Sequence, residues 1–89
     1  MSTLNIMFFS INTLNIVYSK PMRTFGENLK KERKIAGLNQ KDFAEKLGTT
    51  QQRVSEWECG KVEPTLYNII AIIQVLDITF EDLISGIEK

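Results

Sequence analysis

Four polar side chains within one short stretch could hydrogen-bond to the edges of nucleic-acid bases. They are the amides, hydroxyl and carboxylate of Gln51, Gln52, Ser55 and Glu56. Positions three and four apart share one face of an α-helix, so these groups fall on a single arc. An amide can contact adenine bidentately, and a carboxylate can accept from cytosine N4. The stretch predicts a helix able to read a major groove, and the alternative interpretation is an ordinary solvated helix face.

Two short helices joined by a tight glycine turn are predicted around this face. Asn39 and Thr50 can each accept hydrogen bonds from the N–H groups that have no partner at a helix start. Gly48 can supply the positive φ that ends the first helix and turns the chain. Val54 and Trp57 lie three apart, away from the polar arc, so they are predicted in the core and not stacked on bases. This pattern is typical of a helix-turn-helix.

Residues 24 to 85 resemble the Cro and phage-repressor type, or XRE family, of helix-turn-helix regulators. The resemblance rests on a joint pattern made by Arg33, Gly37, Gln40, Ala44, Gly48, Val54, Trp57, Glu58, Gly60 and Pro64. It implies an all-α fold, a compact five-helix bundle of the lambda-repressor-like DNA-binding type. It also implies a sequence-specific transcriptional regulator, with repression the simplest mechanism, that binds double-stranded DNA as a homodimer in successive major grooves.

The resemblance also implies roles for individual residues. It places Gln51, Gln52, Ser55 and Glu56 at base edges. The residues expected at phosphates are Gln40, Lys41, Thr50, Arg53 and Lys61, although Lys41 and Arg53 could equally be solvated. Arg33 and Glu58 match a pair that forms a partly buried ion pair in the family, and the alternative is two ordinary surface charges.

Two positions depart from the family pattern. Glu56 stands where a glutamine is expected, and its carboxylate repels phosphate. Cys59 stands where an asparagine touches the DNA backbone, so a side-chain contact is expected to be missing there. The base preference of a relative therefore should not be transferred to this chain.

Composition argues against an enzyme. The chain has 89 residues, no histidine and one cysteine, Cys59, so neither an internal disulfide nor a usual zinc site can be built. No glycine-rich phosphate loop occurs, and the acidic residues are scattered. We expect one small domain, residues 23–89, with no catalytic residues, no metal and no cofactor.

Charge is polarised along the chain, although the formal net charge is zero. Residues 23–61 carry nine basic and six acidic side chains, whereas residues 62–89 carry one basic and five acidic ones. The positive part therefore coincides with the segment that carries the motif, as phosphate binding would need.

Three further helices are expected as scaffold, at about residues 24–36, 66–76 and 80–85. The side chains predicted to face the core are Phe25, Leu29 and Ala36 in the first, Leu66, Ile69, Ile70, Ile73 and Leu76 in the second, and Phe80, Leu83 and Ile84 in the third. Ile72, Val75 and Ile87 are left over. They could form a dimer surface or be covered by the N-terminus.

Residues 1–22 form an apolar N-terminal extension with Lys20 as the one charged side chain before Pro21. The extension is too interrupted for a membrane span and lacks the features of a signal peptide. It could be a dimerising strand arm, a disordered tail or a translated leader before Met22. We expect a cytoplasmic protein, with two alternatives to a plain repressor: an antitoxin that also binds a toxin, and a protein-interaction module that retains the fold.

Overall fold

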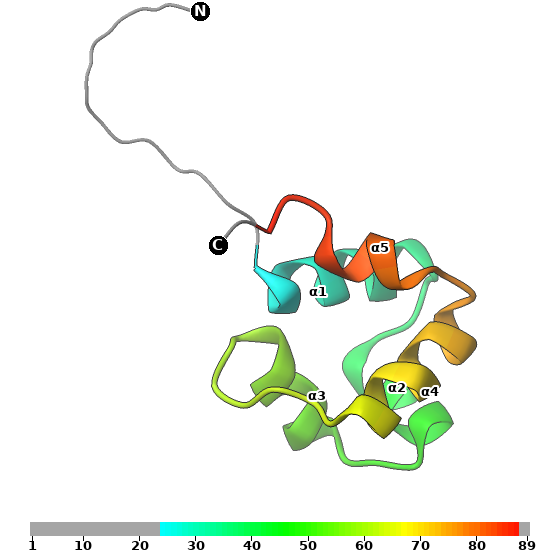
Figure 1. Ribbon diagram of the computed structural model, residues 1–89. Helices are drawn as coiled ribbons and strands as arrows, with labels where there is room; N and C mark the ends of the chain where they lie inside the picture. Colours follow the sequence, from blue (N-terminus) through cyan, green and yellow to red (C-terminus); the bar gives the residue numbers. More distant parts are fainter. Residues whose placement is uncertain (1–23, 88–89) are drawn as a thin grey trace, which may run out of the picture.

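The computed structural model describes residues 24–87, which form five α-helices and no strand. The helices are α1 (Phe25–Ile35), α2 (Gln40–Leu47), α3 (Gln51–Glu58), α4 (Leu66–Leu76) and α5 (Phe80–Ile84). Figure 1 shows α1 and α5 side by side above α2, α3 and α4. The predicted all-α five-helix bundle is confirmed. The extension predicted for residues 1–22 lies outside the described residues.

Every helix begins after a threonine or asparagine that caps its first turn. Each cap side chain accepts a hydrogen bond from the backbone N–H three residues further on, and the caps are Thr24, Asn39, Thr50, Thr65 and Thr79. At Thr24 and Thr79 the acidic side chain three residues on also accepts from the cap's own N–H, which closes a capping box. Short local signals therefore place all five helix starts.

The core gathers one face from each helix. Its buried apolar residues are Leu29, Phe43, Ala44, Val54, Trp57, Ile72, Leu76 and Leu83. Trp57 and Val54 lie inside as predicted, and Phe43 and Ala44 on the facing helix α2 are buried as well. Ala36 was placed in the core by the sequence pattern, but it is exposed because it forms the C-cap of α1, where the chain leaves the bundle.

The predicted core face of α4 is correct in part. Leu76 is buried and Ile69 and Ile73 pack against the core, as predicted, but the other positions differ. Ile72 is fully buried although the predicted stripe left it out, whereas Leu66 is 67% exposed and Ile70 is 43% exposed. Nearly every position of α4 is apolar, so its sequence has no polar face to mark the outside. Ile72 is therefore unavailable for a dimer surface, and the apolar side chains that α4 exposes are those near its start.

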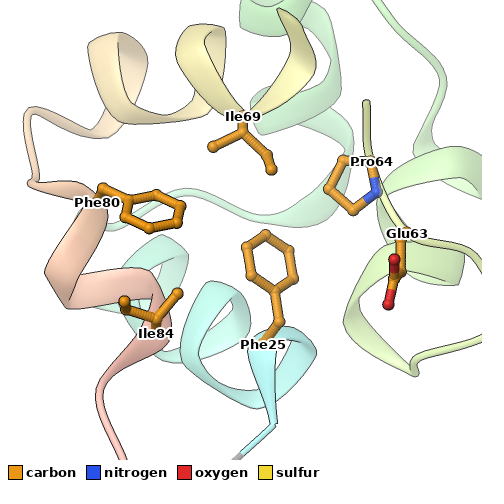
Figure 2. A pocket seen from close by; sticks show the side chains of 6 residues that line it. All are labelled: Phe25, Glu63, Pro64, Ile69, Phe80 and Ile84. Atoms are coloured by element: carbon orange, nitrogen blue, oxygen red, sulfur yellow. The ribbon is translucent and has the colours of Figure 1, made fainter. Parts of the chain in front are cut away.

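α5 also turns fewer apolar side chains inward than predicted. Leu83 is fully buried, but Phe80 and Ile84 are 47% and 38% exposed. Both line a surface groove together with Phe25 at the start of α1 (Figure 2).

α1 crosses the end of α3 at a glycine. A Cβ atom built at Gly26 would lie 2.3 Å from the carbonyl oxygen of Glu58 and 2.7 Å from that of Trp57. Both obstacles are helical backbone, which cannot rotate aside as a flexible side chain can. The two helices can therefore approach this closely only if position 26 has no side chain.

We expect Gly26→Ala to lower the free energy of unfolding by about 2–3 kcal/mol, although alanine usually favours a helix, because the added methyl overpacks a backbone contact. Urea denaturation followed by Trp57 fluorescence measures the loss. Gly37→Ala is the control: its φ of +78° disfavours alanine, but the new methyl meets nothing within 4 Å. That change should cost only about 1 kcal/mol. Equal losses would contradict the close-contact explanation.

Candidate nucleic-acid interface

The turn between α2 and α3 has the geometry that the sequence predicts. Gly48 adopts a left-handed conformation with φ of 74°, and its N–H returns to the last turn of α2. Thr50 then caps α3 two residues later by accepting from the N–H of Arg53 at 3.1 Å. The buried faces of α2 and α3 pack against each other, so the turn is rigidly framed on both sides.

The outer face of α3 carries the polar side chains singled out above. Gln51 and Gln52, in its first turn, are exposed, and Ser55 and Glu56 are half-buried. The Nε2 of Gln52 donates to Glu56 Oε2 at 3.4 Å, across one turn of the helix. The structure thus brings all four groups to one surface. It also links Gln52 to Glu56, the position where the family pattern has a glutamine.

The residues expected at phosphates divide into two groups. Lys41, Thr50, Arg53 and Lys61 are all exposed around the two helices. Gln40 is half-buried, and its Nε2 donates to Glu58 Oε1 at 3.1 Å. Because a side-chain amide nitrogen carries two hydrogens, this bond leaves one of them free to contact another acceptor.

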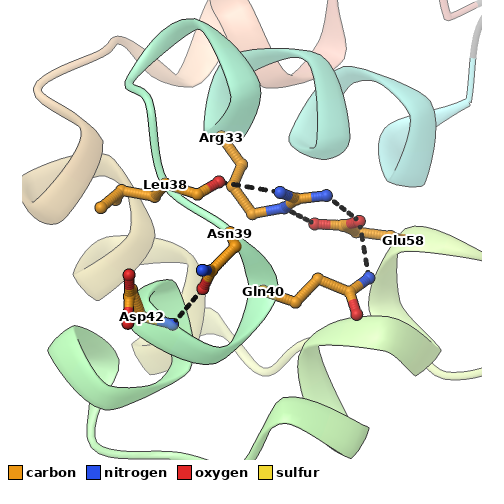
Figure 3. Close-up of polar contacts among 6 residues, drawn as sticks. All are labelled: Arg33, Leu38, Asn39, Gln40, Asp42 and Glu58. Atoms are coloured by element: carbon orange, nitrogen blue, oxygen red, sulfur yellow. Dashed lines mark hydrogen bonds and ion pairs between the residues drawn. The ribbon is translucent and has the colours of Figure 1, made fainter.

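An ion pair lies beneath the interface (Figure 3). Arg33 on α1 donates through Nε to Glu58 Oε2 at 2.6 Å and through Nη2 to Oε1 at 3.0 Å. Its Nη1 donates to the carbonyl of Leu38 at 2.8 Å. The side chains are only 7% and 4% exposed. A planar guanidinium facing a carboxylate in this way fixes both orientation and distance.

The ion pair joins three helices at one point. Arg33 comes from α1, Glu58 is the last residue of α3, and Gln40 is the first residue of α2. All the hydrogen bonds of this cluster are directional, so the end of α3 is held in a defined position relative to α1 and α2. The cluster positions the helix that bears the polar face.

The structure also brings a lysine to this surface that the sequence reasoning missed. Lys30 on α1 lines a hollow of about 220 Å³ together with Gln40, Ser55, Glu58 and Cys59. The sequence could have indicated Lys30, because it lies three residues before Arg33 and this spacing puts both side chains on one side of α1. An ammonium group here adds a positive charge on α1 beside the polar face of α3.

The described residues contain no cluster that could hold a metal. Between residues 24 and 87, no three His, Cys, Asp or Glu side chains stand close enough to share an ion. Cys59 is an exposed free thiol whose Sγ donates to the carbonyl of Glu56 at 3.6 Å. No helix in the same range is both long and apolar enough to cross a bilayer.

Two capped helices joined by a glycine turn, with a polar outward face on the second, define a helix-turn-helix domain of the phage-repressor type. Residues 29–83 match the helix-turn-helix family HTH_3, and the chain belongs to this family. The resemblance to XRE-type regulators is thereby confirmed.

Similar proteins include regulators and repressors. The uncharacterized HTH-type transcriptional regulator YqaE of Bacillus subtilis (strain 168) is 40% identical over 62 residues, which are 70% of this chain and 53% of that protein. This chain therefore spans about half of that relative. Among solved structures, the P22 c2 repressor in complex with a synthetic operator is 25% identical with a TM-score of 0.66, covering 72% of this chain and 97% of that one.

Two other solved structures show how widely the fold is used. The restriction-modification controller protein C.AhdI from Aeromonas hydrophila is 32% identical with a TM-score of 0.63, covering 66% of this chain and 86% of that one. The hydroxypropylphosphonic acid epoxidase of S. wedmorenis is 33% identical with a TM-score of 0.63, but the match covers only 35% of that enzyme. The fold thus also occurs as one part of a larger enzyme.

Proposed function

We propose that the protein is a sequence-specific DNA-binding regulator of transcription that inserts α3 into the major groove. The observation that carries the proposal is the division of α3 into two faces. Val54 and Trp57 are buried, while Gln51 and Gln52 are exposed in the first turn. In helix-turn-helix proteins the N-terminal residues of the second helix contact base edges, which is where these amides lie. The complex of the related P22 c2 repressor with a synthetic operator supports this mode of binding.

Phosphate contacts would surround this face. Lys41, Arg53 and Lys61 are exposed cations near it, and the backbone at the start of α3 offers further donors. Lys30 adds a fourth cation from α1. The free N–H of Gln40 would reach a phosphate while the other stays on Glu58, which would couple the DNA backbone to the buried ion pair.

The regulator would act as a homodimer on a twofold operator, and repression by blocking polymerase is the simplest mechanism that this domain allows. Dimers of this class place two recognition helices one helical turn apart, so a single polar face per chain is enough. Leu66, Tyr67 and Ile70 form an exposed apolar surface on the first turns of α4. Exposed apolar surfaces of this kind commonly mark protein contacts, and this one would serve the dimer.

Selection of the purified protein against a random DNA duplex pool tests the proposal. We expect enrichment of a palindrome whose half-sites are separated by roughly 10 bp, with affinity that falls steeply as salt is raised. A pool that stays random, with weak and sequence-blind binding, would overturn sequence-specific recognition. A single enriched half-site without symmetry would overturn the homodimer alone.

A further inference from the structure

An apolar groove is lined by residues of α1, α4 and α5 and of the loop before α4. Figure 2 shows the side chains of Phe25, Ile69, Phe80 and Ile84 pointing toward one another around it, with Pro64 and Glu63 at one edge. Its volume is about 210 Å³. That is below the range of about 300–1,000 Å³ typical of small-molecule sites. A few side chains of a polypeptide would fit the groove better than a cofactor would.

The apolar surface continues from the groove to the point where the chain enters α1. A neighbouring hollow of about 240 Å³ shares Phe25 and Glu63 with the groove and is lined by Thr24 and Val62 as well. Thr24 is the N-cap of α1 and has an extended backbone conformation. The chain that precedes Thr24 is therefore attached at the rim of this surface.

The sequence before Thr24 is suited to such a surface. Residues 1–20 carry one charged side chain, Lys20, and include the consecutive apolar residues Ile16, Val17 and Tyr18. From Tyr18 to Phe25 an extended chain spans at most about 25 Å, so these residues have the length to return to the groove. Lys20 is also close enough along the chain to reach Glu63, which is the only charged residue of the groove.

We propose that Ile16, Val17 and Tyr18 occupy this groove within the same chain, with Lys20 facing Glu63. Contact with them would bury the exposed parts of Phe80 and Ile84, which favours docking through the loss of apolar surface from water. This inference concerns a face that carries none of the residues proposed to contact DNA, so it stands or falls independently of the proposed function.

A nitroxide spin label provides the test. Cys59→Ser removes the single native thiol and Ser19→Cys introduces another for labelling. In the ¹⁵N-labelled full chain, the amide signals of Ile69, Phe80 and Ile84 should be strongly broadened. Adding Ile16→Glu and Val17→Glu should clearly weaken this broadening, because two carboxylates would have to enter an apolar groove. The control, Thr13→Glu, adds a carboxylate outside the docking residues and should leave the broadening unchanged.

A mixed sample distinguishes docking within one chain from docking between two copies of the chain. Spin-labelled chains without ¹⁵N are combined with unlabelled ¹⁵N chains, so only contacts between molecules broaden the signals. We expect no broadening at Phe80 or Ile84 in this mixture. Broadening there would overturn docking within one chain and assign the groove to a second copy. Broadening that is undiminished by the Ile16→Glu and Val17→Glu changes, or none in the first sample, would also overturn the proposal.

Discussion

Glu58→Gln is expected to lower the free energy of unfolding by about 3–5 kcal/mol, because it leaves the guanidinium of Arg33 buried without its carboxylate. Arg33 donates two hydrogen bonds to Glu58, and its side chain is only 7% exposed. The neutral amide keeps the size of the side chain but can accept only part of this bonding. Since small domains are stable by roughly 5–15 kcal/mol, the variant should unfold at a markedly lower urea concentration.

Two further variants separate a lost ion pair from lost packing. Glu45→Gln makes the same chemical change at an exposed carboxylate on α2 and should alter stability by less than about 0.5 kcal/mol. The double change Arg33→Met with Glu58→Leu removes both charges and should restore most of the stability, because apolar replacements of buried pairs are often neutral or better. If Glu58→Gln is as mild as Glu45→Gln, the pair does not hold the helices together.

Replacing both Gln51 and Gln52 by alanine is expected to weaken binding to the selected operator by about 2–6 kcal/mol, since each bidentate base contact contributes roughly 1–3 kcal/mol of discrimination. That range corresponds to a loss of affinity between roughly 30-fold and 10⁴-fold. Binding to unrelated DNA should change little, because phosphate contacts carry no base preference. Fluorescence anisotropy with operator and scrambled duplexes measures both effects.

The control for the Gln51 and Gln52 variant is an exposed glutamine on another helix. Gln74→Ala on α4 makes the same truncation on another helix and should leave operator affinity unchanged. Both variants should keep the thermal stability of the parent, because none of the three positions is buried. Operator affinity that survives the double change would show that α3 does not read bases through this face.

The sequence by itself determined where the helices begin and end. Asn39 and Thr50 were predicted as caps, and this was possible because a cap bonds to an N–H only three residues away. Gly48 ends α2 for an equally local reason. The polar face of α3 was also predictable, because α3 is amphipathic and its 3.6-residue period separates Gln51 and Gln52 from Val54 and Trp57.

Only the tertiary structure decided which side of α4 faces inward, because an apolar helix has no polar stripe to indicate its outer side. Gly26 was not singled out, because its importance comes from the backbone of α3, which crosses it more than thirty positions later in the chain. Asn28 gave no signal either, yet it is buried, and its Nδ2 donates to the carbonyls of Leu83 and Ser85.

The hydrogen bond of Gln40 to Glu58, and the position of Lys30 beside the end of α3, likewise follow from the packing of separate helices. Sequence spacing controls contacts within one helix, whereas contacts between helices depend on how whole faces pack against each other.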